Sequence, residues 1–252
     1  MKRPWDRDRI VWISHRGVTA RAVENTRLAF QDAVAAGFDT LETDLLATRD
    51  GVLVLAHDDD LSHIAKSNRR ISESNYDELE AIPLLDGQRI LRFDEFVDEF
   101  AGQRWLLDIK PETSTQVIDL LAGWMQDRAF ASMLRERARF LFWSDREQRY
   151  GQTRLPGIRC TARQSESYRA GIASFLGLAW LGGIEAGKTY GLTATFKGLN
   201  LFTPRVFDAY HSRGARVLAY LPETGREIER ALWAGADEVI LDFAYDRMVS
   251  SP

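Results

Sequence analysis

Short apolar runs alternate with amphipathic stretches of helical period along most of the 252-residue chain. An apolar stripe that recurs every three or four residues predicts a helix, whereas a short apolar run bounded by turn residues predicts a strand. Regular alternation of the two predicts parallel strands joined by crossover helices, which is the α/β class. The predicted strands are 10–14, 38–45, 105–110, 139–144, 158–162, 175–181, 215–221 and 238–243, and the predicted helices include 25–36, 93–100, 115–125, 204–213 and 226–234.

The length and the alternation together predict a parallel (β/α)8 barrel, the TIM-barrel fold, which typically uses about 250 residues. A doubly wound open sheet is the alternative, and it is expected to carry a Gly-rich nucleotide-binding turn after its first strand. The sequence at that point is His15-Arg16-Gly17, which is not a GxGxxG motif. We therefore expect one barrel domain that covers residues 1–252.

One pair of strand-like segments breaks the alternation. Residues 40–48 and 52–57 both have strand character, and only three residues, which include Asp50-Gly51, separate them. A parallel crossover needs a dozen or more residues, so these two segments are expected to pair antiparallel as a hairpin with Asp-Gly in the turn. The barrel is therefore predicted to carry a hairpin directly after its second parallel strand.

The hairpin register predicts which residues meet at its open end. Symmetric pairing about the turn places His57 opposite residue 43, between Glu42 and Asp44. The stretch 58–90 that follows is rich in Asp, Ser, Asn and Arg. We expect it to be a small inserted cap on the barrel rather than a second domain.

Charge and cysteine content exclude several classes of protein. Asp and Glu number 37 and Lys and Arg number 33, which gives a formal net charge of −4. A general nucleic-acid binder would show a basic footprint, so no nucleic-acid partner is expected. The single cysteine, Cys160, excludes an intramolecular disulfide and gives no sign of an oxidising compartment.

The apolar runs are too short for membrane or export signals. Charged residues dominate 1–9, and the apolar run 10–13 that follows is shorter than the roughly 7–15-residue apolar region of a secretory signal. No stretch approaches the roughly 18 apolar residues of a membrane span. We expect a cytoplasmic protein whose membrane contact is at most peripheral, and nothing in the sequence indicates its oligomeric state.

Ionisable residues gather at the carboxyl ends of the first three parallel strands. Residues two apart in a strand face the same side of the sheet. In barrels of this class, the carboxyl ends of the strands carry the chemistry, so we predict an active site there. Its candidate residues are His15 and Arg16 after the first strand, Glu42 and Asp44 in the second, His57 after the hairpin, and Asp108 and Lys110 at the end of the third.

The three acidic candidates predict a metal site. Glu42 and Asp44 lie inside an apolar strand, and neither face of a closed parallel barrel offers them water. Burying two carboxylates costs several kcal/mol each unless a cation compensates for their charge. Asp108 adds a third oxygen ligand, as Mg²⁺ or Ca²⁺ prefers. We therefore predict that these three residues bind one divalent ion, Mg²⁺ or Ca²⁺.

The remaining candidates predict phosphodiester chemistry. The three acids, Arg16, Lys110 and one divalent ion give the site a net charge of +1 with neutral histidines, which suits a monoanionic phosphodiester. Arg16 and Lys110 are predicted to bind the phosphate. His15 and His57 are predicted to be the acid–base pair, because the pKa of histidine lies near the operating pH. His15 is the preferred base and His57 the preferred acid. The nucleophile is left open between water and a neighbouring hydroxyl of the substrate, which would give a cyclic phosphate.

At these residues the sequence resembles the glycerophosphodiester phosphodiesterase family. Five short motifs occur in the family's order within residues 11–110, and a weaker match extends to the last two strands. The resemblance implies a (β/α)8 barrel with an insertion after the second strand, the three acids as metal ligands and the two histidines as the acid–base pair. The motifs are His15-Arg16-Gly17, Glu24-Asn25-Thr26, Glu42-x-Asp44, Asp50-Gly51 followed by His57-Asp58, and Asp108-x-Lys110.

The sequence departs from the family at positions that bear on the substrate. Asp108 stands where the family usually has Glu. The related spider-toxin branch, with phospholipase D or sphingomyelinase D activity, is similar in having Asp at this position. That branch acts on lysophospholipids and sphingolipids. The segment around Tyr220 also differs from the family's Trp-Thr-Val-Asn. Tyr220 and Trp180 are expected at the mouth of the barrel, so these differences leave the released alcohol open.

The resemblance implies a metal-dependent hydrolase that converts glycerophosphodiesters to an alcohol and glycerol phosphate. The alternative is a lysophospholipase D-like enzyme that forms a cyclic phosphate, because the apolar, Gly-rich stretch 175–192 offers a wall for an acyl chain. An alternative of another class is a catalytically silent barrel that binds a phosphorylated ligand. A metal-dependent isomerase or aldolase acting on a phosphorylated sugar is a further alternative, but it has no need for two histidines beside the metal ligands.

Overall fold

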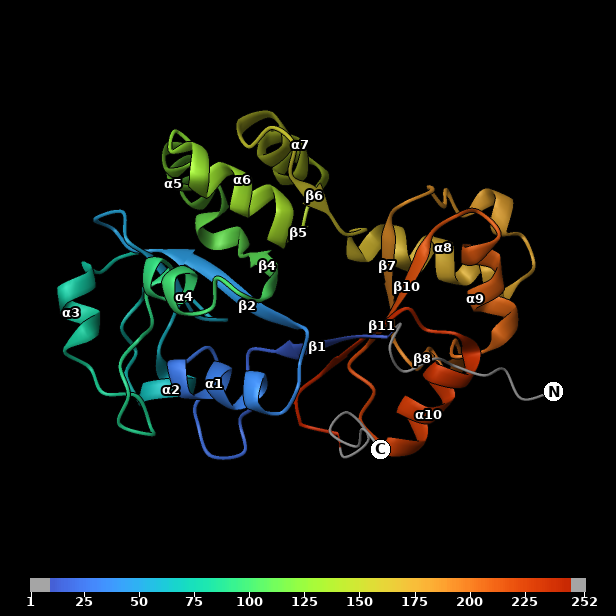
Figure 1. The fold of residues 1–252 in the computed structure, drawn as a ribbon, viewed down its shortest axis with the longest axis horizontal. Helices are drawn as coiled ribbons and strands as arrows, with labels where there is room; N and C mark the ends of the chain where they lie inside the picture. The colour runs from blue at the N-terminus through green and yellow to red at the C-terminus, as the bar shows by residue number, and fades with distance from the viewer. Residues whose placement is uncertain (1–9, 246–252) are drawn as a thin grey trace. The chain divides into compact units, whose positions relative to one another are not determined.

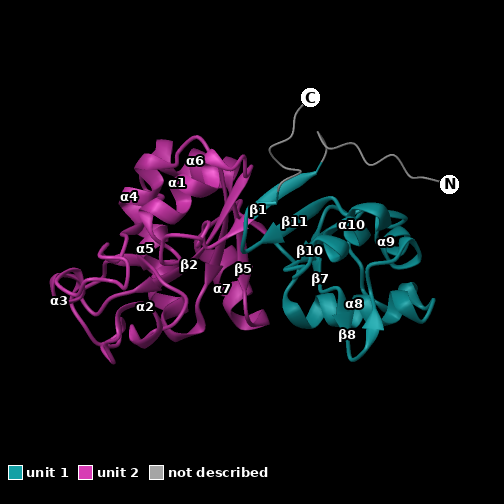
Figure 2. Ribbon diagram, turned by 90° about the horizontal axis from the view of Figure 1, so that it is seen from below, with its two compact units in different colours: residues 1–13, 161–252 teal, residues 14–160 magenta. Residues whose placement is uncertain are grey.

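The computed structural model describes residues 10–245 and divides them into two compact units, which are described separately. Unit 2 covers residues 14–160 and unit 1 covers the rest (Figure 2). Residues 1–9, on which part of the cytoplasmic prediction rests, lie outside the described residues, as do residues 246–252. The organisation as one domain stays a prediction.

Unit 2 consists of parallel strands separated by helices, with one added antiparallel strand, β3 (Figure 1). It begins within β1 (Val11–His15), whose first three residues belong to unit 1. The other elements of unit 2 are α1 (Arg27–Ala35), β2 (Thr40–Ala47), β3 (Leu53–Leu55), α2 (Ser62–Ala65), α3 (Tyr76–Glu80), α4 (Phe93–Glu99), β4 (Arg104–Ile109), η2 (Pro111–Thr113), α5 (Ser114–Trp124), α6 (Arg128–Arg137), β5 (Ala138–Phe142), α7 (Asp145–Arg154) and β6 (Arg159–Cys160).

The sheet of unit 2 has the strand order β6-β5-β4-β2 with all neighbours parallel. All eight residues of β2 are buried, which confirms that this strand has no solvent-exposed face. Its register with β4 places Asp44 directly beside Asp108. The sheet therefore aligns two of the predicted metal ligands on neighbouring strands.

The predicted hairpin is present. β3 pairs antiparallel with β2, and Leu45 lies opposite Leu55, which is the register predicted from the sequence. Gly51 occupies the turn with a positive φ of +83°, a conformation that glycine adopts without steric cost. Beyond the ladder, the Ala56 N–H donates to the Asp44 carbonyl oxygen at 3.2 Å. The chain that leads to His57 is thereby tied to β2.

The stretch 58–90 forms a small apolar core with the outer side of the hairpin. The polar residues of the stretch are connected through Asp59. Asp59 accepts hydrogen bonds from the backbone and the side chain of Ser72, and it forms an ion pair with Arg70. Because the segment packs on the hairpin, it depends on β2 and β3 for its hydrophobic partners. The buried members of this cluster are Leu46, Val54, Ala56, Leu61, Ile64, Ile71, Tyr76, Leu79, Leu84 and Ile90.

Aromatic side chains fill the space between the helices and the sheet of unit 2. Phe96 of α4 lies at the centre, with ring centroids 4.9 Å from Phe30 of α1 and 5.9 Å from Trp105 of β4. Burial of such rings contributes about 1.5–3 kcal/mol each. This packing holds α1 and α4 against the strands that carry the site.

Unit 1 repeats the same alternation of strand and helix. Its parallel strands have the order β11-β10-β7, and β1 enters it through the Val11 N–H, which donates to the Asp237 carbonyl oxygen. Among the described residues, no helix of either unit has the length and apolar character needed to cross a membrane. The elements of unit 1 are α8 (Gln164–Phe175), η3 (Ala179–Leu181), β7 (Thr189–Leu192), β8 (Thr195–Phe196), β9 (Leu199–Asn200), α9 (Pro204–His211), β10 (Arg216–Tyr220), α10 (Gly225–Ala234) and β11 (Glu238–Leu241).

One strand prediction is wrong. Residues 175–181 were expected to be a strand, but α8 ends at Phe175 and a short 3-10 helix follows at Ala179–Leu181. Gly177 has a φ of +77° directly after the helix, and leucines on both sides of it are exposed. A short apolar run does not by itself separate a strand from a helix end. The strand of this region is β7, which lies further along the chain.

Candidate active site

In the turn after β1, the charged residue Arg16 has an unusual backbone conformation. Arg16 has a φ of +56° and Gly17 a φ of +90°. The Arg16 N–H points at Glu42 and lies 3.1 Å from both its carbonyl oxygen and its Oε2. A non-glycine residue with positive φ is uncommon, and such strain concentrates at functional sites. The turn thus joins His15 and Arg16 to the strand that carries the acidic residues.

Gly17 is expected to be sensitive to a single added methyl group. A Cβ there would lie 2.5 Å from the Ala29 Cβ and 2.7 Å from the Ala29 carbonyl carbon. We expect Gly17→Ala to lower the free energy of unfolding by about 2–4 kcal/mol, through overpacking and the positive φ together. Gly51→Ala is the matched control, because its φ is also positive but its Cβ would meet only Leu120 Cδ2 at 3.7 Å. Urea unfolding of both variants checks this, and equal losses would contradict it.

The three predicted acidic ligands lie together. One oxygen of each carboxylate of Glu42, Asp44 and Asp108 lies within 4.8 Å of the others, and all three side chains are buried. Residues 42 and 44 share one face of β2, and Asp108 is the register partner of Asp44 on β4. The parallel sheet therefore produces a cluster of carboxylates of the kind that binds a hard divalent cation.

Asp44 is held by cations on two sides. Its Oδ1 lies 2.9 Å from Lys110 Nζ, and its Oδ2 lies 3.1 Å from Arg16 Nε. Burial alone would raise the pKa of Asp44, but Lys110 and Arg16 lower it below the ordinary aspartate value. Oδ1 is fully buried and accepts no hydrogen bond of good geometry despite the nearby ammonium. This oxygen can therefore accept a further cation.

Asn25 supports Asp44 from the loop before α1. Its Nδ2 donates to Asp44 Oδ2 at 2.8 Å, and its Oδ1 accepts from Thr43 Oγ1 at 2.7 Å. Asn25 is buried with a φ of +57°, whereas Thr26 caps the helix by accepting the Ala29 N–H. Thr26 therefore caps the helix, whereas Asn25 fixes the orientation of a metal-ligand candidate.

Glu42 is the least compensated of the three acids. Its carboxylate lies 4.0 Å from His15 Nε2 and accepts the Arg16 N–H. Burial, together with Asp44, raises the pKa of Glu42 to about 8, and His15 offsets this only in part. A carboxylate with such a pKa is in the wrong environment for its charged form unless further positive charge is supplied. The donor set therefore fits a dication.

Arg16 has a carboxylate partner that the charge count from the sequence did not include. Its Nη1 lies 3.2 Å from both oxygens of Glu24. Burial would lower the pKa of Arg16, but Asp44, Glu24 and Glu42 raise it. With Glu24 included, the site and one divalent ion are neutral rather than +1. Positive potential at the substrate would then depend on the ion and Lys110 more than on Arg16.

Lys110 joins two of the acids and has an aromatic neighbour. Its Nζ donates to Asp108 Oδ2 at 2.8 Å, contacts Asp44 and lies 5.1 Å from the ring centroid of Trp143. Burial would lower the pKa of Lys110, but Asp44 and Asp108 raise it, so the side chain is charged. The indole Nε1 of Trp143 donates to Asp108 Oδ1 at 2.8 Å. The sequence contained no signal for Trp143 beyond its position near the end of the predicted strand 139–144.

His57 lies at the solvent edge of the hairpin. Its Nδ1 is 2.8 Å from Asp58 Oδ1, and its side chain is about one third exposed. Ala56 before it is bonded to the backbone of Asp44. The structure thus attaches both histidines to β2, His15 through the turn after β1 and His57 through the hairpin, and their shared role in catalysis stays a prediction.

The two predicted mouth residues lie in unit 1. Tyr220 is the last residue of β10 and is partly buried, whereas Trp180 lies in η3 and is 70% exposed. Both belong to a unit other than that of the carboxylates. Their contribution to substrate binding stays a prediction.

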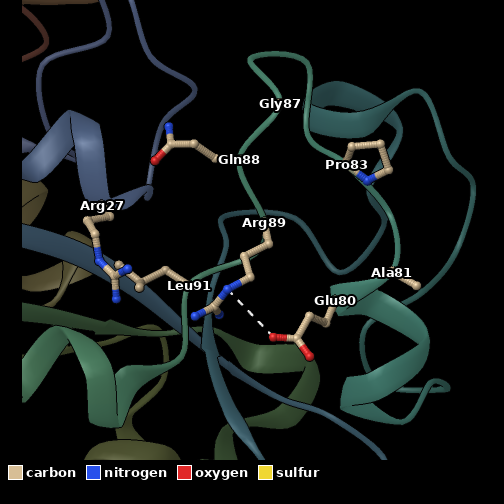
Figure 3. Close-up of a pocket in the computed structure, with 8 residues that line it drawn as sticks. All are labelled: Arg27, Glu80, Ala81, Pro83, Gly87, Gln88, Arg89 and Leu91. Carbon is tan, nitrogen blue, oxygen red and sulfur yellow. Dashed lines mark ion pairs between the residues drawn. The ribbon is translucent and has the colours of Figure 1, made fainter.

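A cavity of about 590 Å³ opens in unit 2 between the start of α1 and the segment before α4 (Figure 3). Its charged side chains already have partners: Arg89 Nε lies 3.6 Å from Glu80 Oε1, and Arg27 Nε lies 2.7 Å from Glu99 Oε2. None of the predicted site residues lines it, so it takes no part in the chemistry considered below. The lining residues are Arg27, Glu80, Ala81, Pro83, Gly87, Gln88, Arg89 and Leu91.

Comparison with known proteins identifies a family whose model matches most of the chain. The model of the glycerophosphoryl diester phosphodiesterase family matches residues 15–245. Human lysophospholipase D GDPD1 is 45% identical over 67 residues, which are 27% of this chain and 21% of the relative. The probable glycerophosphodiester phosphodiesterase 2 of Mycobacterium tuberculosis is 31% identical over 105 residues, which are 41% of this chain and 40% of the relative. The chain thus matches less than half the length of these curated relatives.

Solved structures share the fold. The glycerophosphoryl diester phosphodiesterase domain of an uncharacterized Mycobacterium tuberculosis protein superposes with a TM-score of 0.78 at 17% identity, covering 95% of this chain and 98% of that one. A glycerophosphodiester phosphodiesterase from Agrobacterium tumefaciens has a TM-score of 0.71 at 18% identity and covers 93% of this chain and 97% of its own. At such identities the likeness concerns the fold alone, and it confirms the predicted (β/α)8 barrel class.

Proposed function

Because the chain belongs to the glycerophosphoryl diester phosphodiesterase family, we propose that it hydrolyses glycerophosphodiesters to an alcohol and glycerol phosphate with one divalent metal ion. The partner is then a small-molecule phosphodiester. We propose Mg²⁺ or Ca²⁺ as the ion, because both prefer carboxylate oxygens as ligands. A cytoplasmic location stays a prediction from the sequence.

The observation that carries the proposal is the cluster of three buried carboxylates. One oxygen each of Glu42, Asp44 and Asp108 lies within 4.8 Å of the others. Burying several acids together is costly unless cations compensate, and Arg16 and Lys110 supply only two charges. Glu42, Asp44 and Asp108 would therefore hold the ion. A divalent ion bound there would polarise the phosphoryl group and stabilise the charge that develops on its non-bridging oxygens.

The phosphate is bound by the cationic side chains that border the cluster. Lys110 is held in place by Asp44 and Asp108, so its ammonium needs no reorientation to meet a phosphate oxygen. Arg16 is fixed by Glu24 and Asp44 in the same way. Such preorganised charges stabilise a transition state more than mobile ones do.

The two histidines move the protons. His15 accepts a proton from the attacking hydroxyl as the new P–O bond forms, and His57 donates a proton to the alcohol oxygen as the old P–O bond breaks. Asp58 can accept a hydrogen bond from His57 Nδ1–H at 2.8 Å, which leaves Nε2 as the nitrogen that exchanges a proton with the substrate. Water as nucleophile gives glycerol phosphate directly, whereas a hydroxyl of the substrate gives a cyclic phosphate.

Phosphorus NMR of the reaction products tests the proposal. Glycerophosphocholine incubated with the chain and either Mg²⁺ or Ca²⁺ is expected to lose its phosphodiester resonance and to form a phosphomonoester. A five-membered cyclic phosphate in its place would identify the substrate's hydroxyl as the nucleophile. A phosphodiester resonance that persists with both ions would contradict the proposal, and the silent, ligand-binding barrel would be favoured if lysophosphatidylcholine also remained intact.

A lysophospholipase D-like activity is the second candidate, favoured by an exposed apolar segment. Leu176, Leu178, Trp180 and Leu181 are all exposed after α8. An apolar surface of this kind suits an acyl chain. One relative is a human lysophospholipase D, although the match covers 21% of its length. A direct comparison of glycerophosphocholine with lysophosphatidylcholine separates the two, because a higher kcat/KM for the lysolipid is expected only if the segment contacts its acyl chain.

A further inference from the structure

Trp143 is partly exposed to solvent and also contacts the buried charged residues of the site. It follows β5 directly and is 48% exposed, yet its Nε1 donates to the buried Asp108 Oδ1 at 2.8 Å. Its ring centroid lies 5.1 Å from Lys110 Nζ. A half-exposed tryptophan that bonds one buried acid and faces one buried cation makes contacts that ordinary surface packing does not require.

The hydrogen bond from Trp143 fixes Asp108 from one side. Lys110 Nζ donates to Oδ2 of the same carboxylate at 2.8 Å, so each oxygen of Asp108 has its own donor. Rotation of the carboxylate about Cβ–Cγ would break both bonds. The lone pairs that these donors leave unused therefore keep a constant direction relative to Glu42 and Asp44.

The aromatic face of Trp143 acts on Lys110. A lysine ammonium near an aromatic face is stabilised electrostatically, more so when it is shielded from water. Lys110 is only 3% exposed and already contacts Asp44 and Asp108. The ring therefore contributes to holding the ammonium between the two carboxylates.

We propose that Trp143 is a positioning residue of the active site, which orients Asp108 as a metal ligand through its indole N–H and confines Lys110 through its ring. The inference rests on the proposed function, because it assumes that Asp108 binds a divalent ion. Donors that hold a metal-binding carboxylate typically change metal affinity or activity 10–100-fold when they are removed.

Two phenylalanine variants test the proposal. Trp143→Phe keeps an aromatic ring near Lys110 but removes the N–H. Trp233→Phe is the matched control, because Trp233 of α10 is 49% exposed and lies in unit 1. We expect Trp143→Phe to weaken Mg²⁺ or Ca²⁺ binding about 10-fold by calorimetry without substrate, while the metal-free melting temperature stays equal to that of the control. Metal-induced change in tryptophan fluorescence is expected in the control and reduced in Trp143→Phe.

The outcomes separate this inference from the proposed function. A metal Kd of Trp143→Phe within twofold of the control would overturn the role of Trp143, and hydrolysis by the wild-type chain would leave the proposed function standing. Failure of the wild-type chain to bind either ion would overturn both. Weaker metal binding by Trp143→Phe, with an unchanged metal-free melting temperature, would support the positioning role.

Discussion

Replacing either His15 or His57 by alanine is expected to lower kcat by two to four orders of magnitude while the chain stays folded. General acid–base catalysis by a positioned side chain typically contributes this much. His15 Nε2 lies 4.0 Å from a carboxylate of the cluster, and His57 has Asp58 to orient its ring. His57 is about one third exposed, so its loss removes little packing, whereas His15 is buried at the end of β1, so the melting temperature of its variant must be compared with that of the wild-type chain. Initial rates at saturating substrate measure the effect.

His63→Ala is the control for the histidine variants. His63 lies in α2 within the inserted stretch and is exposed, so its loss is expected to leave kcat within about twofold, as for an ordinary surface substitution. Equal melting temperatures would show that the catalytic variants are folded. If both His15→Ala and His57→Ala retain more than a tenth of the wild-type kcat, the acid–base assignment is rejected.

Asp44→Asn is expected to destabilise the fold and to abolish metal binding. Asp44 is fully buried and contacts Lys110 at 2.9 Å and Arg16 at 3.1 Å, so its neutralisation leaves two cations short of a partner. Breaking a buried ion pair from one side typically costs about 3–5 kcal/mol. Because the pKa of Asp44 is lowered, this stabilisation is present above the unfolded value of about 3.9 and is lost as the pH falls through the folded value. Urea unfolding at neutral pH measures it.

An exposed ion pair of the same unit provides the control. Asp32 of α1 contacts Arg21, whose side chain is largely exposed. Exposed pairs contribute little, since water and salt screen them, so Asp32→Asn is expected to leave the unfolding midpoint nearly unchanged. Loss of stability by Asp32→Asn as large as that by Asp44→Asn would contradict the view that burial of the charge network causes the effect.

The sequence was sufficient to predict the acidic part of the site. Glu42 and Asp44 are two apart in an apolar strand, and the short turn at Asp50-Gly51 forces a hairpin, so strand geometry alone places these features. The alignment of Asp108 with Asp44 is different. Parallel strands joined by long crossovers carry no local rule for register, so the sequence placed Asp108 only at the same edge of the barrel, at the carboxyl end of the next parallel strand, and not directly beside Asp44.

The supporting residue Trp143 could not be predicted, because its contact with Asp108 is long-range. Trp143 bonds Asp108 across two neighbouring strands, yet it is an ordinary residue type in its own segment. Glu24 is different, because it belongs to the Glu24-Asn25-Thr26 motif and pairs with Arg16 nearby in the sequence, and only its charge was left out of the count. The strand predicted at 175–181 was wrong because of a local signal. The apolar residues there belong to an exposed helix end rather than to a buried strand. Sequence patterns therefore do not predict contacts that depend on tertiary packing.

The central claim is that three buried carboxylates share one divalent ion. Thermal unfolding of the wild-type chain with increasing Mg²⁺ or Ca²⁺, together with a calorimetric titration, tests it most directly. We predict one bound ion per chain and a melting temperature that rises with metal concentration, equivalent to about 2.7 kcal/mol at one hundred times Kd. A melting temperature that stays constant across millimolar concentrations of both ions would contradict the claim.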